Sequence, residues 1–248
     1  APLLKRIEAD PTEPALYVQL AAAYRRHGQL DRARAALQQG LGPTGNHFSL
    51  RVELQELDIA PLRRDLEKTD AAIQALKAQL DAGDEPADGP TVDELTAARA
   101  ALAKEVAARE VTLLRTKADR FPADLSFRLE LGSRLLKADR VNEAVAELQP
   151  VKKDDKLKGR ASLLLGACFR KLNNLRLAQR NFEDALQTLP ATDEGSRKEV
   201  LYQLATIAAD GKDLNRAVDL GHELANLDYN FKDIGTLLAQ WEKRVQEA

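Results

Sequence analysis

The sequence predicts an all-α chain of repeated helical hairpins, and three observations lead to that prediction. Ala and Leu, both strong helix formers, supply 40 and 41 of the 248 residues. The helix breakers Gly and Pro are few, at 13 and 10. Similar patterns of small and large apolar residues return along the chain at a spacing close to 34 residues. A fixed period of this length is typical of an array of stacked structural units.

The overall composition excludes several classes of protein. Lys and Arg number 37 against 39 Asp and Glu, and the net charge of −2 gives no general attraction to nucleic acid or anionic lipid. The single Cys excludes an intrachain disulfide and a Cys-based zinc site. No apolar run approaches the roughly 20 residues of a membrane-spanning helix. We therefore expect no transmembrane segment, no metal and no small-molecule cofactor.

The repeats are defined by residues that recur at equivalent places. Four units begin at residues 14, 125, 159 and 198, and one further period from 14 and from 198 leads to 48 and 232. The step from 159 to 198 is 39 residues, and we place its five extra residues in a loop at 191–196. Small residues recur where two helices must approach closely: Ala21, Gly132, Gly166 and Ala205 on the first helices, and Ala33, Ala144, Ala178 and Ala217 on the second.

These units resemble the tetratricopeptide repeat (TPR). The fullest match reads Leu165-Gly166, Phe169, Ala178, Phe182, Ala185 and Pro190. The resemblance implies a right-handed TPR superhelix whose first helices line a concave groove, and it implies that a peptide or helix binds there. The groove positions of the family correspond in this sequence to Arg25, Arg26, Lys137, Arg160, Arg170, Lys171 and Tyr202, with Thr206 and Asp210 beyond them.

The charge of the fourth repeat suggests what the groove would bind. Residues 152–180 hold nine Lys or Arg and only two Asp. One hypothesis is that Arg side chains in the groove bind an acidic or C-terminal segment of a partner. The alternative is that these exposed cations only keep the array soluble. The paired Lys and Asn with which some TPR proteins clamp a terminal carboxylate are not matched, because the Asn is missing.

A second pattern interrupts the repeats. The step from 48 to 125 is 77 residues, one period plus an insertion of 43. Within 61–108 the apolar residues follow a heptad spacing on either side of a Gly- and Pro-containing stretch at 82–90, and Thr91 with Glu94 forms a capping box after it. This predicts an antiparallel coiled-coil arm, which would be a spacer or would pair with another copy or a partner helix. The predicted seam consists of Leu62, Leu66, Ile73, Leu76, Leu80, Leu95, Leu102 and Val106.

The predicted organisation therefore has four parts. Residues 1–60 form an N-terminal TPR segment and residues 61–108 the inserted coiled-coil hairpin. Residues 109–231 form the C-terminal repeats, and residues 232–248 a capping helix with Trp241 as its packing anchor.

No pattern in the sequence argues for catalysis. Residues 40–45 match G-x-G-x-x-G, but no strand precedes them, so we interpret them as a loop between repeats. His27, His47 and His222 lack the spacing of metal ligands. Cys168 lies beside Gly166 on an apolar face, which is typical of a small buried thiol.

The function expected from these observations is a non-catalytic protein–protein interaction scaffold that uses the groove and the arm. The alternative is that the chain is an accessory or regulatory domain of a larger envelope or enzyme complex. A nucleic-acid binder is disfavoured because only Phe169 could supply a stacking platform near the basic repeat. The usage of Ala and Arg is typical of a bacterial protein. A chain that begins Ala1-Pro2 leaves its compartment open, with a cytoplasmic location favoured over a periplasmic or membrane-associated one.

Overall fold

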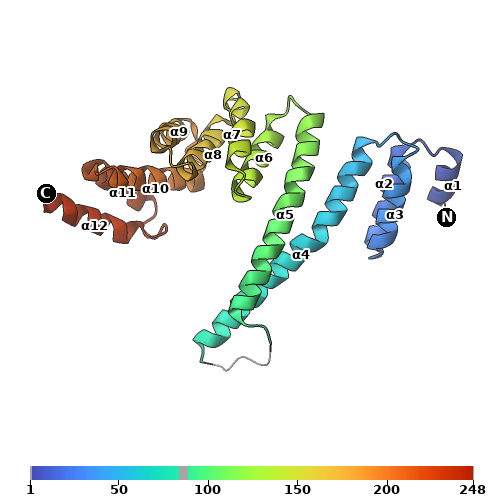
Figure 1. Ribbon diagram of the computed structural model, residues 1–248, viewed down its shortest axis with the longest axis horizontal. Helices are drawn as coiled ribbons and strands as arrows, with labels where there is room; N and C mark the ends of the chain where they lie inside the picture. The colour runs from blue at the N-terminus through green and yellow to red at the C-terminus, as the bar shows by residue number, and fades with distance from the viewer. Residues whose placement is uncertain (1, 84–88, 248) are drawn as a thin grey trace. The chain divides into compact units, whose positions relative to one another are not determined.

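A computed structural model describes residues 2–83 and 89–247, and every regular element in these ranges is a helix (Figure 1). The chain divides into two compact units, Ala1–Lys117 and Ala118–Ala248, and the boundary between them falls within a single long helix. None of the described helices is both long enough and apolar enough to cross a membrane. Each unit is built from helical hairpins and is described below in turn.

Unit 1 begins with three short helices, α1 (Pro2–Ala9), α2 (Pro14–Arg26) and α3 (Leu30–Leu41). Their buried faces and the start of α4 share one core that includes Tyr17, Leu37 and Leu50. Gly40 is required in this core, because a Cβ there would lie 2.6 Å from the ring of Tyr17. Of the residues 40–45, which we predicted as a loop, the first two are the end of α3, and the turn starts after Leu41.

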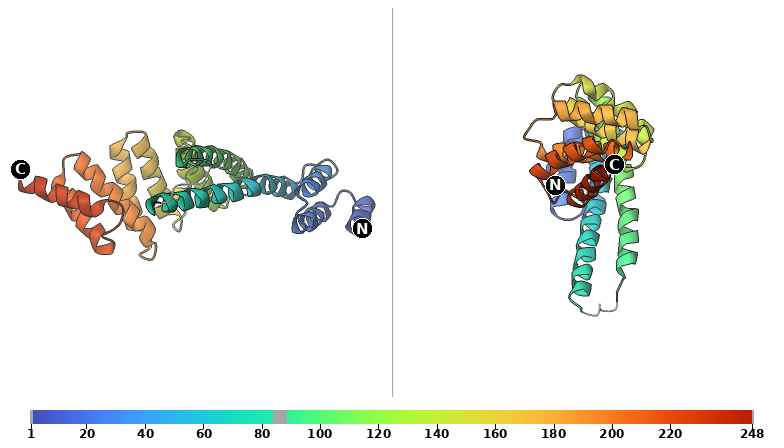
Figure 2. Two further views of the ribbon diagram at one scale, coloured as in Figure 1. Left: turned by 90° about the horizontal axis from the view of Figure 1, so that it is seen from below. Right: turned by 90° about the vertical axis from the view of Figure 1, so that its left-hand side faces the viewer.

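Two long helices complete unit 1. Helix α4 (Phe48–Asp81) and helix α5 (Val92–Arg120) run antiparallel and side by side (Figures 1 and 2). The predicted capping box is present, since the Thr91 N–H donates to Glu94 Oε2 at 2.8 Å and the Glu94 N–H donates to Thr91 Oγ1 at 3.2 Å. The predicted stretch at 82–90 includes residues 84–88, which lie outside the described residues.

The predicted seam positions differ in burial. Ile73 and Val106 are buried, whereas Leu80 is 47% exposed. Val106 packs with Ile59 and Leu113 near the start of the paired helices. The five other predicted seam residues are half-buried: Leu62, Leu66, Leu76, Leu95 and Leu102. Apolar contact between α4 and α5 therefore concentrates at the end nearest the short helices.

Unit 2 consists of three hairpins and a terminal helix. The first helices are α6 (Leu125–Lys137), α8 (Lys158–Lys171) and α10 (Glu194–Asp210). The second helices are α7 (Val141–Leu148), which is followed by the 3₁₀ turn η1 (Pro150–Lys153), α9 (Leu175–Thr188) and α11 (Leu214–Leu227). Helix α12 (Ile234–Gln246) closes the unit, and its buried Trp241 packs in a cluster with residues of α10 and α11.

Close approach within these hairpins depends on the predicted small residues. A Cβ at Gly132 would lie 2.5 Å from Leu148, and one at Gly166 would lie 2.6 Å from the ring of Phe182. Leu148 and Phe182 are both fully buried. Each large side chain on a second helix thus fills the space that a glycine leaves on the first helix.

The backbone confirms the repeat register. A residue with positive φ stands 14 residues after each of the predicted starts at 14, 125, 159 and 198 and turns the chain between two helices. These residues are Gly28, Asp139, Asn173 and Lys212. The constant position of this left-handed residue shows that the four hairpins share one turn geometry.

One boundary prediction is wrong. Residues 194–196, which we expected in a loop, belong to the first turn of α10. The helix starts early because the side chain of Asp193 accepts a hydrogen bond from the Ser196 N–H and caps it. The extra residues therefore lengthen α10 as well as the connection before it.

Candidate functional site

The first helices of unit 2 line an open hollow of about 420 Å³. Leu136 of α6 and Ala167 of α8 supply apolar surface, Arg170 and Lys171 of α8 supply positive charge, and Gln203 of α10 completes the lining. The hollow therefore spans three successive repeats and brings together two of the predicted groove residues.

The two cations of this hollow are held differently. Arg170 donates from Nη1 to the Thr206 hydroxyl at 3.1 Å and also to Gln203 Oε1. Both acceptors are neutral, so they orient the guanidinium without cancelling its charge. Lys171 instead pairs with Asp139 at 2.8 Å, and the Asp139 side chain is 80% exposed. An ion pair so exposed contributes little and exchanges readily.

The other predicted groove residues of unit 2 lie outside this lining. Arg160 pairs with Asp193 at 3.2 Å, and Lys137 is exposed at the end of α6. The Tyr202 hydroxyl donates to Asp233 at 2.8 Å. Burial, and then the neighbouring Asp233 carboxylate, raise the pKa of Tyr202 above its usual value. Arg160 and Tyr202 therefore make contacts between successive helices as they stand.

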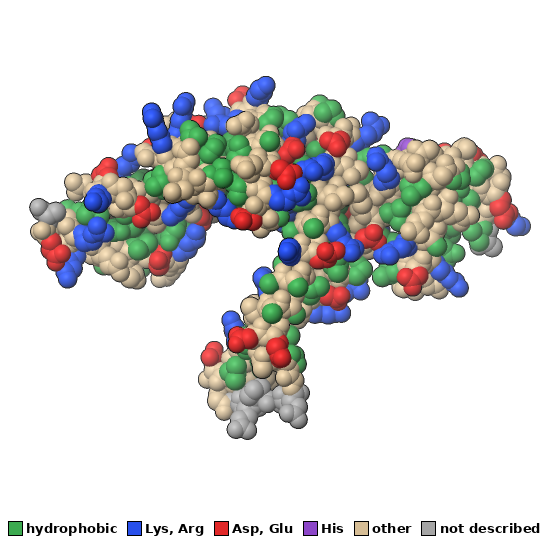
Figure 3. All heavy atoms as spheres, in the orientation of Figure 1, with side chains coloured by type: hydrophobic (Ala, Val, Ile, Leu, Met, Phe, Trp, Pro, Cys, Tyr) green, Lys and Arg blue, Asp and Glu red, His purple; other side chains and the backbone are tan. Residues whose placement is uncertain are grey.

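Such contacts recur along unit 2. Cations and carboxylates about one period apart in sequence form ion pairs, within one hairpin in Lys198–Asp228 at 3.0 Å and between neighbouring repeats in Lys152–Asp184 at 2.8 Å. Lys232–Glu199 and Arg216–Glu183 repeat the arrangement. Basic side chains gather over α7 to α9 on the face that Figure 3 presents. The basic character of residues 152–180 is thus partly balanced by acidic residues of adjoining repeats.

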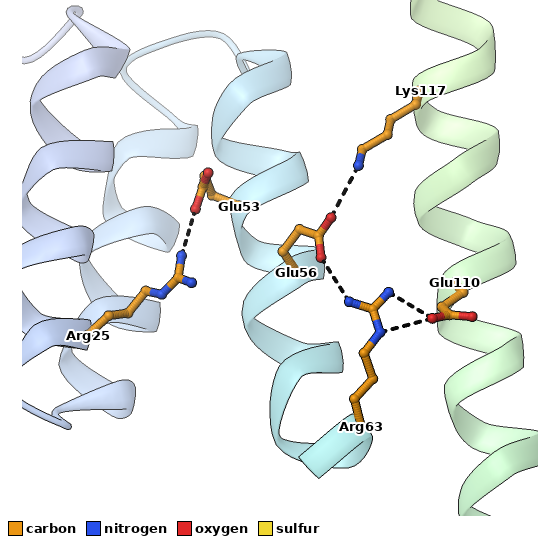
Figure 4. Close-up of polar contacts among 6 residues, drawn as sticks. All are labelled: Arg25, Glu53, Glu56, Arg63, Glu110 and Lys117. Atoms are coloured by element: carbon orange, nitrogen blue, oxygen red, sulfur yellow. Dashed lines mark hydrogen bonds and ion pairs between the residues drawn. The ribbon is translucent and has the colours of Figure 1, made fainter. Parts of the chain in front are cut away.

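Unit 1 contains a second hollow, of about 440 Å³. It brings together the predicted residues Arg25 and Arg26 on α2. Arg25 pairs with Glu53 of α4 at 3.1 Å (Figure 4). The remaining lining residues are Ala22, Leu30, Leu57, Ala60, Pro61 and Arg64.

Sequence reasoning missed several of the lining residues. Gln203 and Arg64 were not anticipated, because Gln203 lies between groove positions of the family and Arg64 lies in the insertion. A signal for the interrepeat partners was present, since Arg160 and Asp193 are 33 residues apart, close to one period. Comparing charges one repeat apart would have indicated that pairing.

The residues with potential for chemistry take structural roles. His47 caps α4, where its Nδ1 accepts from the Ser49 N–H at 3.3 Å. His222 lies 3.0 Å from a carboxylate oxygen of Glu242. Cys168 is buried, and this burial raises the pKa of its thiol to about 11 although Lys171 acts in the opposite direction. At neutral pH this thiol is therefore protonated and a poor nucleophile.

Comparison with known proteins gives one family match. Residues 3–35, which span α1, α2 and the first part of α3, match the model of the tetratricopeptide repeat. No curated protein matches the chain.

Several solved structures are similar to this chain at low sequence identity. A chain of the APC/C hetero-tetramer Cut9–Hcn1 is 16% identical with a TM-score of 0.46, and the match covers 96% of this chain and 45% of that one. A tetratricopeptide repeat protein from Parabacteroides merdae is 14% identical with a TM-score of 0.35, covering 92% and 98%. The assembly chaperone of RpL4 is 16% identical with a TM-score of 0.30, covering 95% and 84%. This chain thus spans less than half the length of the Cut9–Hcn1 chain.

The family match agrees with the repeats at the start of the chain. Helical hairpins with one shared turn geometry occur in both units, and the first of them lies largely within the matched residues. The family match over residues 3–35 and these repeated hairpins support a tetratricopeptide repeat protein.

Proposed function

We propose that this chain is a non-catalytic protein-interaction scaffold that binds an acidic segment of a partner protein in the hollow of unit 2. The observation that carries the proposal is the lining of that hollow. Apolar Leu136 and Ala167 lie beside the charged ends of Arg170 and Lys171, and the four residues come from neighbouring first helices. A segment with both acidic and aliphatic side chains matches this combination.

The state of the two cations supports an acidic partner. Arg170 is oriented by Gln203 and Thr206 and keeps its charge, so a carboxylate gains a fixed guanidinium without first breaking an internal ion pair. Lys171 can exchange the exposed Asp139 for a carboxylate of the partner at little cost. Lys137, which follows Leu136 on α6, would extend the basic rim.

The experiment is a binding titration with a labelled, end-capped peptide of Asp-Glu-Leu triplets. We expect the Arg170→Gln/Lys171→Gln variant to weaken binding by about tenfold or more. The matched control is Arg176→Gln/Arg180→Gln, which removes two exposed charges from α9 outside the hollow. Equal affinity of the two variants would overturn the assignment of the hollow.

We also propose that the paired ends of α4 and α5 associate with a second copy of the chain. Leu80 is 47% exposed and Leu76 and Leu95 are half-buried, so apolar surface lies near the far end of these helices. Sedimentation of the wild type and of Leu80→Lys/Leu95→Lys tests this. A monomer for both proteins at high micromolar concentration would contradict self-association and leave the arm as a spacer.

A further inference from the structure

The hollow of unit 1 has a wall that the insertion supplies. On one side lie Ala22, Arg25 and Arg26 of α2, together with Leu30 at the start of α3. On the other side lie Leu57, Ala60, Pro61 and Arg64 of α4. The last two belong to the segment that the sequence pattern assigns to the insertion. The continuation of α4 therefore adds a third arginine to the two of α2.

The two walls are fixed to each other. The Arg25–Glu53 ion pair joins α2 to α4 at 3.1 Å, and Leu57 is buried in the core that both helices share. Pro61 lies inside α4, where it contributes no N–H to the helix. Close to it, Arg109 of α5 donates to the Asp58 carbonyl at 3.2 Å and ties α4 to α5. The hollow is thus bordered by helices that are held in place on both sides.

The charges around the hollow are only partly balanced. Arg25 has Glu53 as its partner, and among the described residues neither Arg26 nor Arg64 forms an ion pair. Both of these side chains are exposed. Two guanidinium groups therefore face solvent beside a floor of Ala22, Leu57 and Ala60. Arginine recognises carboxylates through paired N–H donors, and it keeps its charge at every physiological pH.

We infer that this hollow is a second protein-binding site. It binds a segment in which an aliphatic side chain stands between two carboxylates, one on each side. The carboxylates pair with Arg26 and Arg64, and the aliphatic side chain covers the floor between them. A cavity of about 440 Å³ is large enough for such a group of side chains. The floor is aliphatic and offers no aromatic platform for a base, so charge complementarity points to an acidic polypeptide and not to a nucleic acid.

This site is separate from the hollow of unit 2, although both would bind acidic segments. The test therefore uses the full chain with Arg170→Gln/Lys171→Gln as its background, so that the hollow of unit 2 no longer contributes. The probe is the labelled, end-capped Asp-Glu-Leu peptide. Comparison probes are the same peptide with Asn and Gln in place of Asp and Glu, and a labelled single-stranded oligothymidylate.

In that background we expect Arg64→Gln or Arg26→Gln to weaken peptide binding by about tenfold, and the amide peptide to bind weakly to every variant. The matched control is Arg51→Gln, which removes an exposed charge from the same helix outside the hollow. A third variant, Ala60→Phe, fills the floor without changing a charge and should also weaken binding.

Several results would overturn the inference. One is equal affinity of Arg64→Gln and Arg51→Gln for the peptide, and another is binding of the oligothymidylate as tight as that of the acidic peptide. This outcome is independent of the proposed function, because failure of the proposed function appears as equal affinity of the Arg170→Gln/Lys171→Gln and Arg176→Gln/Arg180→Gln proteins. Failure here appears within the Arg170→Gln/Lys171→Gln background, as equal affinity of the Arg64 and Arg51 variants or as equally tight binding of the oligothymidylate.

Discussion

Arg63 of α4 donates two hydrogen bonds to the same carboxylate oxygen of Glu110 in α5, from Nε at 2.9 Å and from Nη2 at 2.7 Å (Figure 4). Glu110 is only 6% exposed. Arg63 also lies 3.4 Å from Glu56, which Lys117 of α5 contacts at 3.1 Å. A charged network therefore joins the two long helices at the end where their apolar contacts also concentrate.

Removing one partner of this pair should destabilise unit 1. Arg63→Met leaves the Glu110 carboxylate buried with less compensation, and we expect a loss of about 1–3 kcal/mol in the free energy of unfolding. The double variant Arg63→Met/Glu110→Met should recover most of that loss, because no buried charge is left behind. Urea unfolding followed by circular dichroism measures both.

A matched control is the exposed pair between Arg99 and Asp70 of the same two helices. Arg99→Met should change the stability by no more than about 0.5 kcal/mol. If Arg63→Met were equally mild, the buried network would not be what holds α4 and α5 together.

The close approach of α8 and α9 gives a second prediction. A Cβ at position 166 would lie 2.6 Å from ring atoms of Phe182, which is fully buried. Gly166→Ala should therefore destabilise the protein by about 1–3 kcal/mol, measured by urea unfolding. Gly195→Ala in the first turn of α10 is the control, since nothing lies within 4 Å of a Cβ there. The double variant Gly166→Ala/Phe182→Leu should lose less stability than the two single variants lose together. Strict additivity would show that the ring is not the obstacle.

The turn residues give a third prediction. Lys212 has a φ of 66° at the position that Gly28, Asp139 and Asn173 occupy in the other hairpins. A lysine is strained there, so Lys212→Gly should stabilise the protein by about 0.5–1 kcal/mol. Gly28→Ala, at a φ of 71° with open space around it, should destabilise by a similar amount. Thermal unfolding of both variants tests whether the two changes in stability have opposite signs. A destabilised Lys212→Gly would contradict the argument.

Much of the hairpin architecture was predictable because it depends on local and periodic features. The starts of α2, α4 and α6 at residues 14, 48 and 125 follow from the spacing of small and large residues, and the capping box of Thr91 follows from four residues of sequence. The partners of the groove cations were not predicted, since they come from neighbouring repeats. Glu110 was missed because the predicted seam contains only apolar residues, whereas this carboxylate is buried beside them.

The single thiol gives a fourth prediction. Burial raises the pKa of Cys168 to about 11, so almost no thiolate exists at pH 8 in the folded protein. Alkylation of the native protein should therefore be much slower than alkylation in urea. Gly166→Ala, which disturbs the helix pair beside the thiol, should accelerate the reaction. Equal rates in native and unfolded protein would mean that Cys168 is not protected by the fold.

The same thiol should make stability depend on pH in a definite direction. Its pKa is about 11 in the folded protein, above the value of about 8.5 expected for an unfolded chain. Below about pH 8.5 both states hold the proton, so Cys168 adds no pH dependence there. Between these two pKa values the unfolded state loses its proton first, and the free energy of unfolding falls as the pH rises. Lys and Tyr residues titrate in the same range, so the measured quantity is the difference between wild type and Cys168→Ala. That difference in the free energy of unfolding should be constant from pH 6 to 8. From pH 9 to 10.5 the wild type should lose stability relative to Cys168→Ala. A difference that stays constant throughout would mean that the thiol has the same pKa in both states.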